Sequence, residues 1–229
     1  LMFGALFVLL LTGYPLASFV GGLSAVSIAA LWSPGAFALV PPRVWNNLTQ
    51  YLLAAIPLFI FMASMLEKSG VIEEVFDVAY KWLGRIPGGL AVATVVASTV
   101  LAAMVGVIGA AVVTMALVAL PSMLRRGYSP VLAVGTVMAG GTLGILIPPS
   151  VLAIVYGLVA NQSVGELYLG SVFPGLVLSG LYILFSVGYA LLNPKAAPRL
   201  SPEETPTWSE RWRALRSIWS PLVLIFLVL

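Results

Sequence analysis

From Gly140 to Tyr156 the sequence reads GGTLGILIPPSVLAIVY. The stretch lies in an uncharged run from residue 127 to residue 165, which is long enough to cross a bilayer. Its glycines loosen a helix and Pro148-Pro149 removes two consecutive amide donors, so we expect the helix to break. A break in hydrocarbon leaves backbone groups without partners and is tolerated only beside protein or a water-filled cavity. The stretch therefore predicts a binding site.

The composition identifies the class of protein. Hydrophobic residues make up 61% of the chain and charged residues 8%, and the mean hydropathy is +1.08. Several apolar runs must face lipid or one another, so we predict an all-α polytopic membrane protein in a lipid bilayer. In such proteins a basic excess commonly comes from Lys and Arg residues in cytoplasmic loops. The net charge of +3 therefore does not indicate nucleic acid as a partner.

Apolar runs, prolines and charges divide the chain into segments. The first scaffold spans occupy residues 1–70, with a Pro-containing loop at 33–50, and the chain's first and last residues suggest part of a longer protein. The remaining segments are expected to be an interfacial amphipathic helix at 71–85, a re-entrant helical hairpin at 86–123, a discontinuous transmembrane helix at 130–160, a polar connector at 161–166, a transmembrane helix at 171–193, a cytoplasmic loop at 194–216 and the start of another span at 217–229.

Two of these segments have alternatives. Residues 71–83 show apolar side chains at helical spacing with charges on the other face, which fits a helix in the membrane interface or one packed on its own protein. No charge separates Arg85 from Arg125, yet two full spans need about 20 residues each plus a turn. Gly106 and Gly109 favour a chain reversal and hence a re-entrant hairpin, while two short tilted spans remain the alternative.

The basic residues give a consistent topology. If residues 68–85 are cytoplasmic, every Lys and Arg except Arg43 falls on the cytoplasmic side, as the positive-inside rule requires. A re-entrant hairpin and two full spans at residues 86–123 place the basic residues on the same sides of the membrane. The loop at 194–216 and the residues after it also carry Trp208, Trp212 and Trp219, which suit the level of the lipid headgroups.

The residue types argue for transport and against catalysis. The sequence has no cysteine and no histidine, and it has no acidic cluster at membrane depth that could hold a catalytic metal. A proton-coupled pump needs an ionisable group inside the membrane, and both central runs lack one. Sodium is a better candidate than a proton for the coupling ion, because backbone carbonyls at unwound helix ends bind a hard cation. The N-termini of half-helices can hold an anionic substrate.

The candidate site combines the hairpin tip with the broken helix. We expect helix N-termini near Gly109 and after Pro149 to face an anionic substrate, and sodium to bind the backbone of Gly106, Gly109, Gly141 and Gly144, with no other cofactor. Alternatively, these glycines only let helices pack closely. The candidate residues are Val105, Gly106, Val107, Gly109, Gly140, Gly141, Thr142, Gly144, Pro148, Pro149 and Ser150.

Several motifs resemble one transporter family. In chain order they are AIPLFI at 55–60, GGLA at 88–91, LPSMLRRGY at 120–128, GTLGILIPPS at 141–150, YG at 156–157, QS at 162–163 and FPG at 173–175. Together they resemble the large membrane subunit of TRAP transporters (the DctM-like permease) over nearly the whole chain. The resemblance implies the first half of an inverted-repeat, elevator-type transporter.

The resemblance also implies partners and a location. These are a small TRAP membrane subunit, a periplasmic solute-binding protein that delivers an organic anion, sodium as the coupling ion, and the bacterial inner membrane. The sequence departs from the family at the hairpin tip, where many members carry Ser-Gly-Ser and this chain has Val105-Gly106-Val107. If sodium binds there, backbone carbonyls must replace the two hydroxyls.

We thus expect a sodium-coupled, binding-protein-dependent importer of carboxylate solutes. The alternatives are a secondary anion transporter that works without a binding protein and a membrane scaffold subunit that does not transport. The substrate, the sodium stoichiometry and the oligomeric state are not readable from the sequence, because backbone groups leave no diagnostic side chain.

Overall fold

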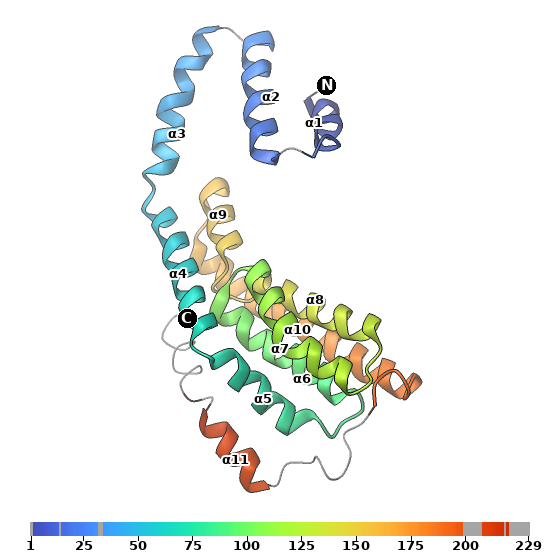
Figure 1. The fold of residues 1–229 in the computed structure, drawn as a ribbon. Coiled ribbons are helices and arrows are strands. Elements are labelled where there is room, and N and C mark those ends of the chain that lie inside the picture. Colours follow the sequence, from blue (N-terminus) through green and yellow to red (C-terminus); the bar gives the residue numbers. More distant parts are fainter. Residues whose placement is uncertain (1, 14, 32–33, 199–207, 218, 220–229) are drawn as a thin grey trace. The chain divides into compact units, whose positions relative to one another are not determined.

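A computed structural model describes residues 2–13, 15–31, 34–198, 208–217 and 219. The chain divides into two compact units, residues 1–53 and residues 54–229. All the regular structure in the described residues is helical, as expected (Figure 1). Three helical stretches are long and apolar enough to cross a membrane, and a bent helix pair makes a fourth. The prediction of an all-α, multi-pass membrane protein is confirmed.

The first unit contains α1 (Met2–Leu10), α2 (Leu16–Leu31), the 3-10 helix η1 (Pro34–Leu39) and α3 (Val40–Leu48). Gly13, at φ +76°, lies between α1 and α2. The predicted loop at 33–50 is wrong over most of its length, because η1 and α3 occupy it. Pro34 begins η1, and Pro41 and Pro42 stand in the first turn of α3, where the missing amide hydrogens would have no helical acceptor.

The second unit begins with two helices joined by a glycine turn. These are α4 (Ala55–Lys68) and α5 (Val71–Leu83), with Gly70 at φ +76° between them; the 3-10 helix η2 (Tyr51–Ala54), which lies mostly in the first unit, precedes α4 in the chain. The apolar face of α5, including Ile72 and Val75 at 1% exposure, is buried. α5 packs against α6 (Gly89–Val105). The amphipathic helix α5 thus packs on its own protein, which is the second of the two alternatives for residues 71–83. The depth of α5 relative to the membrane stays a prediction.

α6 lies at the centre of the second unit. It is buried at 13 of its 17 residues, and it contacts α5, α7 (Ile108–Arg125), α8 (Pro130–Leu146) and α10 (Val164–Leu192). Figure 1 shows α6, α7, α8 and α10 side by side in this unit. Small residues such as Ala91 and Ala97, both fully buried, allow the close approach of these helices.

The connection between α7 and α8 is tied to the start of α6. The amide of Leu90 donates to the Tyr128 hydroxyl at 3.2 Å. Burial raises the pKa of this hydroxyl above its ordinary value, against smaller lowering effects of the Leu90 amide and of Arg126. Arg126 in turn donates to Tyr80 of α5 and stacks over its ring. These contacts bring α5, α6 and the α7–α8 turn together at one end of the unit.

The C-terminal segments differ in part from expectation. α10 begins at Val164, because the Ser163 hydroxyl caps it by accepting from the Glu166 amide at 3.4 Å. The predicted connector at 161–166 is therefore too long and the predicted helix at 171–193 too short. The predicted loop at 194–216 contains α11 (Trp208–Ser217). The predicted next span at 217–229 lies almost entirely outside the described residues.

Candidate functional site

α6 and α7 form a helical hairpin whose tip spans two residues. α6 ends at Val105, and its C-cap residue Gly106 has φ +64° and an amide that donates to the Ala102 carbonyl at 3.3 Å. Only glycine adopts this backbone conformation without strain. Val107 is extended, and α7 begins at Ile108, one residue before the predicted Gly109. α7 alone meets the length of a membrane span, and α6 is one residue shorter than that limit. The choice between re-entrant and spanning arms therefore stays a prediction.

The predicted break in the helix is also present. α8 ends at Leu146, Ile147 is extended, and α9 (Val151–Ala160) follows after a bend of 40°. Ser150 is the N-cap of α9, and its hydroxyl accepts from the Ala153 amide at 3.4 Å. Two consecutive prolines in the connection cannot donate to α8, which is why the helix stops there.

The hairpin tip and the helix break touch each other directly. The Val151 amide at the start of α9 donates to the Gly106 carbonyl at 3.3 Å. A Cβ atom on Gly106 would lie 2.1 Å from the Pro149 carbonyl oxygen, so no larger residue fits. A Cβ on Gly144 would lie at an ordinary 3.8 Å from the Val107 carbonyl. We call the contact between residues 105–109 and 144–151 the tip–break junction.

Four helix ends converge at the tip–break junction. α6 and α8 arrive with their C-termini, and α7 and α9 leave with their N-termini. The last carbonyls of a helix and its first amides have no partners within that helix. Partial negative charge from two helix ends thus lies beside partial positive charge from the other two. Such an arrangement can bind a cation and an anion without ionised side chains.

Two of the predicted site residues serve helix packing. A Cβ on Gly140 would lie 2.4 Å from the Ser98 hydroxyl oxygen, and a Cβ on Gly141 would lie 2.0 Å from a methyl carbon of Val112. Both glycines are buried between α8 and the hairpin arms. The Ser98 hydroxyl is fully buried and has no hydrogen-bond partner among the described residues. Close helix contact explains these two positions.

Other predicted residues differ in their access to the tip–break junction. Thr142 is exposed and turned toward α10, where its hydroxyl lies 3.3 Å from that of Tyr182. Gly109 is exposed, with nothing within 4 Å of a Cβ placed on it. The other predicted residues, Val105, Gly106, Val107, Gly144, Pro148, Pro149 and Ser150, belong to the junction or adjoin it.

Helical hydrogen bonding limits which predicted carbonyls can take a cation. Gly109 and Gly141 stand inside α7 and α8, where a carbonyl accepts the amide four residues on. Gly144 stands in the last turn of α8, where the carbonyl has no such partner. In the described residues, no cluster of three or more His, Cys, Asp or Glu side chains could hold a metal. Cation ligands at the junction would thus be backbone oxygens.

One residue that contacts the junction was not predicted from the sequence. The Tyr168 hydroxyl of α10 donates to the Ser150 carbonyl at 3.3 Å. An isolated tyrosine in an apolar helix carries no pattern that would reveal this contact. Thr114, which lies too far along α7 to reach the tip, bonds instead to the Ala110 carbonyl at 2.9 Å and to a Glu67 carboxylate oxygen at 3.3 Å.

Comparison with known proteins gives a consistent picture. Residues 3–229 match the family described as Tripartite ATP-independent periplasmic transporter, DctM component. The C4-dicarboxylate TRAP transporter large permease protein DctM of Vibrio cholerae is 34% identical over 96% of this chain and 48% of its own length.

Two further relatives carry other names. The ectoine TRAP transporter large permease protein TeaC of Halomonas elongata is 27% identical over 93% of this chain and 49% of its own length. The isethionate TRAP transporter permease protein DctMQ of Oleidesulfovibrio alaskensis is 30% identical over 82% of this chain and 30% of its own length. The chain thus spans about half the length of the curated DctM and TeaC relatives that it matches.

Proposed function

Because the chain belongs to the DctM family of tripartite ATP-independent periplasmic transporters, we propose that it forms one half of a sodium-coupled importer of small carboxylates and contributes to its substrate and ion site. Its relatives are transporter permeases, so the chain belongs with membrane transporters and not with enzymes. The proposed location is the bacterial inner membrane, with the hairpin ends and α11 on the cytoplasmic side.

The tip–break junction is the observation that carries the proposal. The hydrogen bond from the Val151 amide to the Gly106 carbonyl couples α9 to the hairpin. A substrate that binds there contacts both elements at once, so binding can alter how they pack. Helix N-termini favour an anion by about 0.3–1 kcal/mol each at exposed sites and more when partly buried. Two such N-termini give a carboxylate a site without a basic side chain.

Sodium is proposed to bind backbone oxygens on the C-terminal side of the junction. The carbonyl of Gly144 and those of the next two residues lie in the last turn of α8, where helical partners are lacking. Val105 and Val107 provide no hydroxyl at the hairpin tip. Hard cations prefer oxygen ligands, and unwound helix ends in transporters supply them. The proposed sodium ligands therefore come mainly from the backbone carbonyls of α8 and less from the hairpin tip.

The substrate class and the partners follow from the relatives. The Vibrio cholerae relative is named for C4-dicarboxylates and shares the higher identity of the three, so a small dicarboxylate is the proposed substrate. A periplasmic solute-binding protein is proposed to deliver it. The double name DctMQ of the isethionate permease supports a small membrane subunit as a further partner.

Uptake by the complete transporter in proteoliposomes tests this function. Gly144→Leu should reduce sodium-driven dicarboxylate uptake at least tenfold, because a leucine side chain fills the space beside Val107. Gly144→Ala should retain most of the uptake, since its Cβ makes only ordinary contacts. Gly180→Leu is the matched control, because nothing lies within 4 Å of a Cβ at that position of α10.

Three outcomes would count against the proposed function. Unchanged uptake by the Gly144→Leu variant would show that the junction is not the site. Uptake that persists without the periplasmic protein would instead favour a secondary transporter that works alone. Replacing sodium by potassium in the same vesicles tests the coupling ion, and equal uptake in both salts would contradict sodium coupling.

A further inference from the structure

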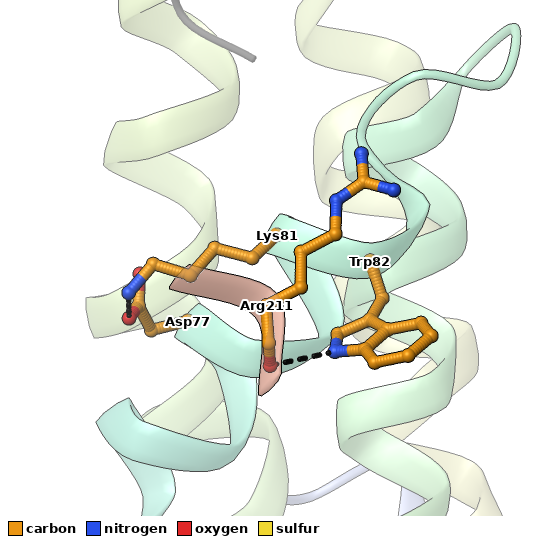
Figure 2. Close-up of polar contacts among 4 residues, drawn as sticks. All are labelled: Asp77, Lys81, Trp82 and Arg211. Carbon is orange, nitrogen blue, oxygen red and sulfur yellow. Dashed lines mark hydrogen bonds and ion pairs between the residues drawn. The ribbon is translucent and has the colours of Figure 1, made fainter. Parts of the chain in front are cut away.

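Two helices outside the tip–break junction, α5 and α11, meet through three tryptophans. The ring centroids of Trp82 and Trp208 are 6.0 Å apart, and Trp212 lies 6.1 Å from each of the other two. The indole N–H of Trp82 donates to the Arg211 carbonyl at 3.2 Å (Figure 2). These contacts hold α11 against the C-terminal end of α5. We call Trp82, Trp208, Arg211 and Trp212 the tryptophan platform.

The outer rings of the tryptophan platform remain open. Trp208 is 63% exposed and Trp212 is 52% exposed, although both contact Trp82. They stand on a helix whose other residues are largely polar, WSERWRALRS. Indole rings of this kind are enriched at the level of lipid headgroups, where one edge is apolar and the other is wet. The apolar face of α5 is buried in protein, so α11 offers the exposed aromatic surface here.

The guanidinium group of Arg211 is the charged part of the platform. Its Nε and Nη2 atoms are buried and have no partner among the described residues, while the side chain as a whole is half-buried. Figure 2 shows its guanidinium directed away from Asp77, which is already paired with Lys81. Unsatisfied guanidinium N–H groups are costly, and a phosphate matches their planar arrangement. Among the described residues these N–H groups have no acceptor, and a phosphate group would supply one.

We propose that the tryptophan platform binds the phosphate of an anionic phospholipid in the cytoplasmic leaflet. Trp208 and Trp212 lie at the headgroup level, and Arg211 contacts the phosphate. The sequence of α11 has three arginines and one glutamate, so its charge complements an anionic surface. Basic residues beside the cytoplasmic leaflet attract such lipids. The role is anchoring, is separate from transport, and does not depend on the proposed substrate.

Quenching of tryptophan fluorescence by brominated lipids tests the platform. The full chain is placed in nanodiscs of phosphatidylcholine that contain equal fractions of brominated phosphatidylglycerol or brominated phosphatidylcholine. The brominated phosphatidylglycerol should quench more strongly, and the double variant W208F/W212F should lose this difference. Arg211→Gln should reduce the preference for phosphatidylglycerol about fivefold, the loss expected for one basic residue at an anionic surface.

A matched charge variant separates a contact at the platform from a general effect of positive charge. Arg43→Gln removes one positive charge from α3, which is remote in sequence from the platform and predicted to lie outside, and should keep the preference. Equal quenching by the two lipids, or an unchanged preference in Arg211→Gln, would overturn the proposal. Inorganic phosphate that changes the fluorescence equally in phosphatidylcholine discs would also overturn it, because the platform would then be an anion site without lipid specificity.

A second measurement needs no variant, so it tests the proposal even if Arg211→Gln does not fold. In the unaltered chain, raising the salt to about 1 M shortens the screening length to about 3 Å. The preference for phosphatidylglycerol should then fall severalfold. A preference that does not change with salt would contradict a charge-based lipid contact.

Discussion

At the scale of single residues, glycines determine how closely the helices approach. Gly106 has a left-handed backbone and lies against the Pro149 carbonyl, so it combines a conformational and a spatial requirement. Gly140 and Gly141 meet Ser98 and Val112 at distances that leave no room for a methyl group. Gly144, in contrast, has space for one carbon. The same residue type thus closes the hairpin, packs a helix and borders the junction.

Alanine substitutions in α8 test the packing role. Gly141→Ala should lower the free energy of unfolding by about 1–3 kcal/mol, because the new methyl group collides with Val112. Adding Val112→Ala should recover part of this loss. Gly135→Ala in the same helix is the control and should be neutral or up to about 1 kcal/mol more stable, since its Cβ meets nothing. Thermal unfolding in detergent measures all three, and equal effects at 135 and 141 would refute the packing role.

The buried hydroxyl of Tyr128 predicts a pH dependence. Burial raises its folded-state pKa above the unfolded value near 10, so its contribution to stability is fully present below pH 10. The contribution disappears as the pH rises through the folded-state pKa. Tyr128→Phe should cost about 1 kcal/mol near neutral pH, because the Leu90 amide loses its acceptor.

Melting temperatures between pH 8 and pH 11 check this prediction. The unaltered chain should lose more stability over this range than the Tyr128→Phe variant does. Tyr51→Phe, at a side chain that is 83% exposed, is the control and should follow the unaltered chain. Parallel profiles for the unaltered chain and Tyr128→Phe would show that this hydroxyl does not titrate with unfolding.

At the scale of helices, the sequence predicted the helix ends that proline or glycine residues cause. Pro148-Pro149 ends α8, and Gly106 reverses the chain, because each acts through local backbone geometry. The helices η1, α3 and α11 were missed, since prolines in a first helical turn and charges on an exposed helix resemble a loop. The contact from Tyr168 to Ser150 joins residues 18 apart and depends on how α9 and α10 pack. A local pattern cannot give it.

The lack of cysteine allows the hairpin's depth to be tested. Gly109→Cys places a thiol on an exposed residue beside the tip. A re-entrant hairpin should leave it unlabelled by a membrane-impermeant maleimide added outside intact cells. Gln162→Cys, in the connection predicted to lie outside, is the labelled control. Labelling of both positions at similar rates would favour two full spans for α6 and α7.

At the scale of the whole molecule, the proposed substrate and ion site lies where α6 and α8 end and α7 and α9 begin. α6 and the helices packed on it form the buried framework of residues 54–229. The tip–break junction lies at the ends of those helices, and the tryptophan platform lies where α5 meets α11. The family relationship covers nearly the whole chain, and the chain spans about half the length of its DctM relative.

The most direct test of the central claim is ligand protection of the junction. Val107→Cys places a thiol at the half-buried tip of the hairpin, in a sequence that has no other cysteine among its 229 residues. In the assembled transporter, sodium together with succinate should slow alkylation of this thiol at least fivefold, and potassium with succinate should not. Gly180→Cys on α10 should react at the same rate in every solution. Equal alkylation of Val107→Cys with and without sodium and succinate would contradict a substrate and ion site at the tip–break junction.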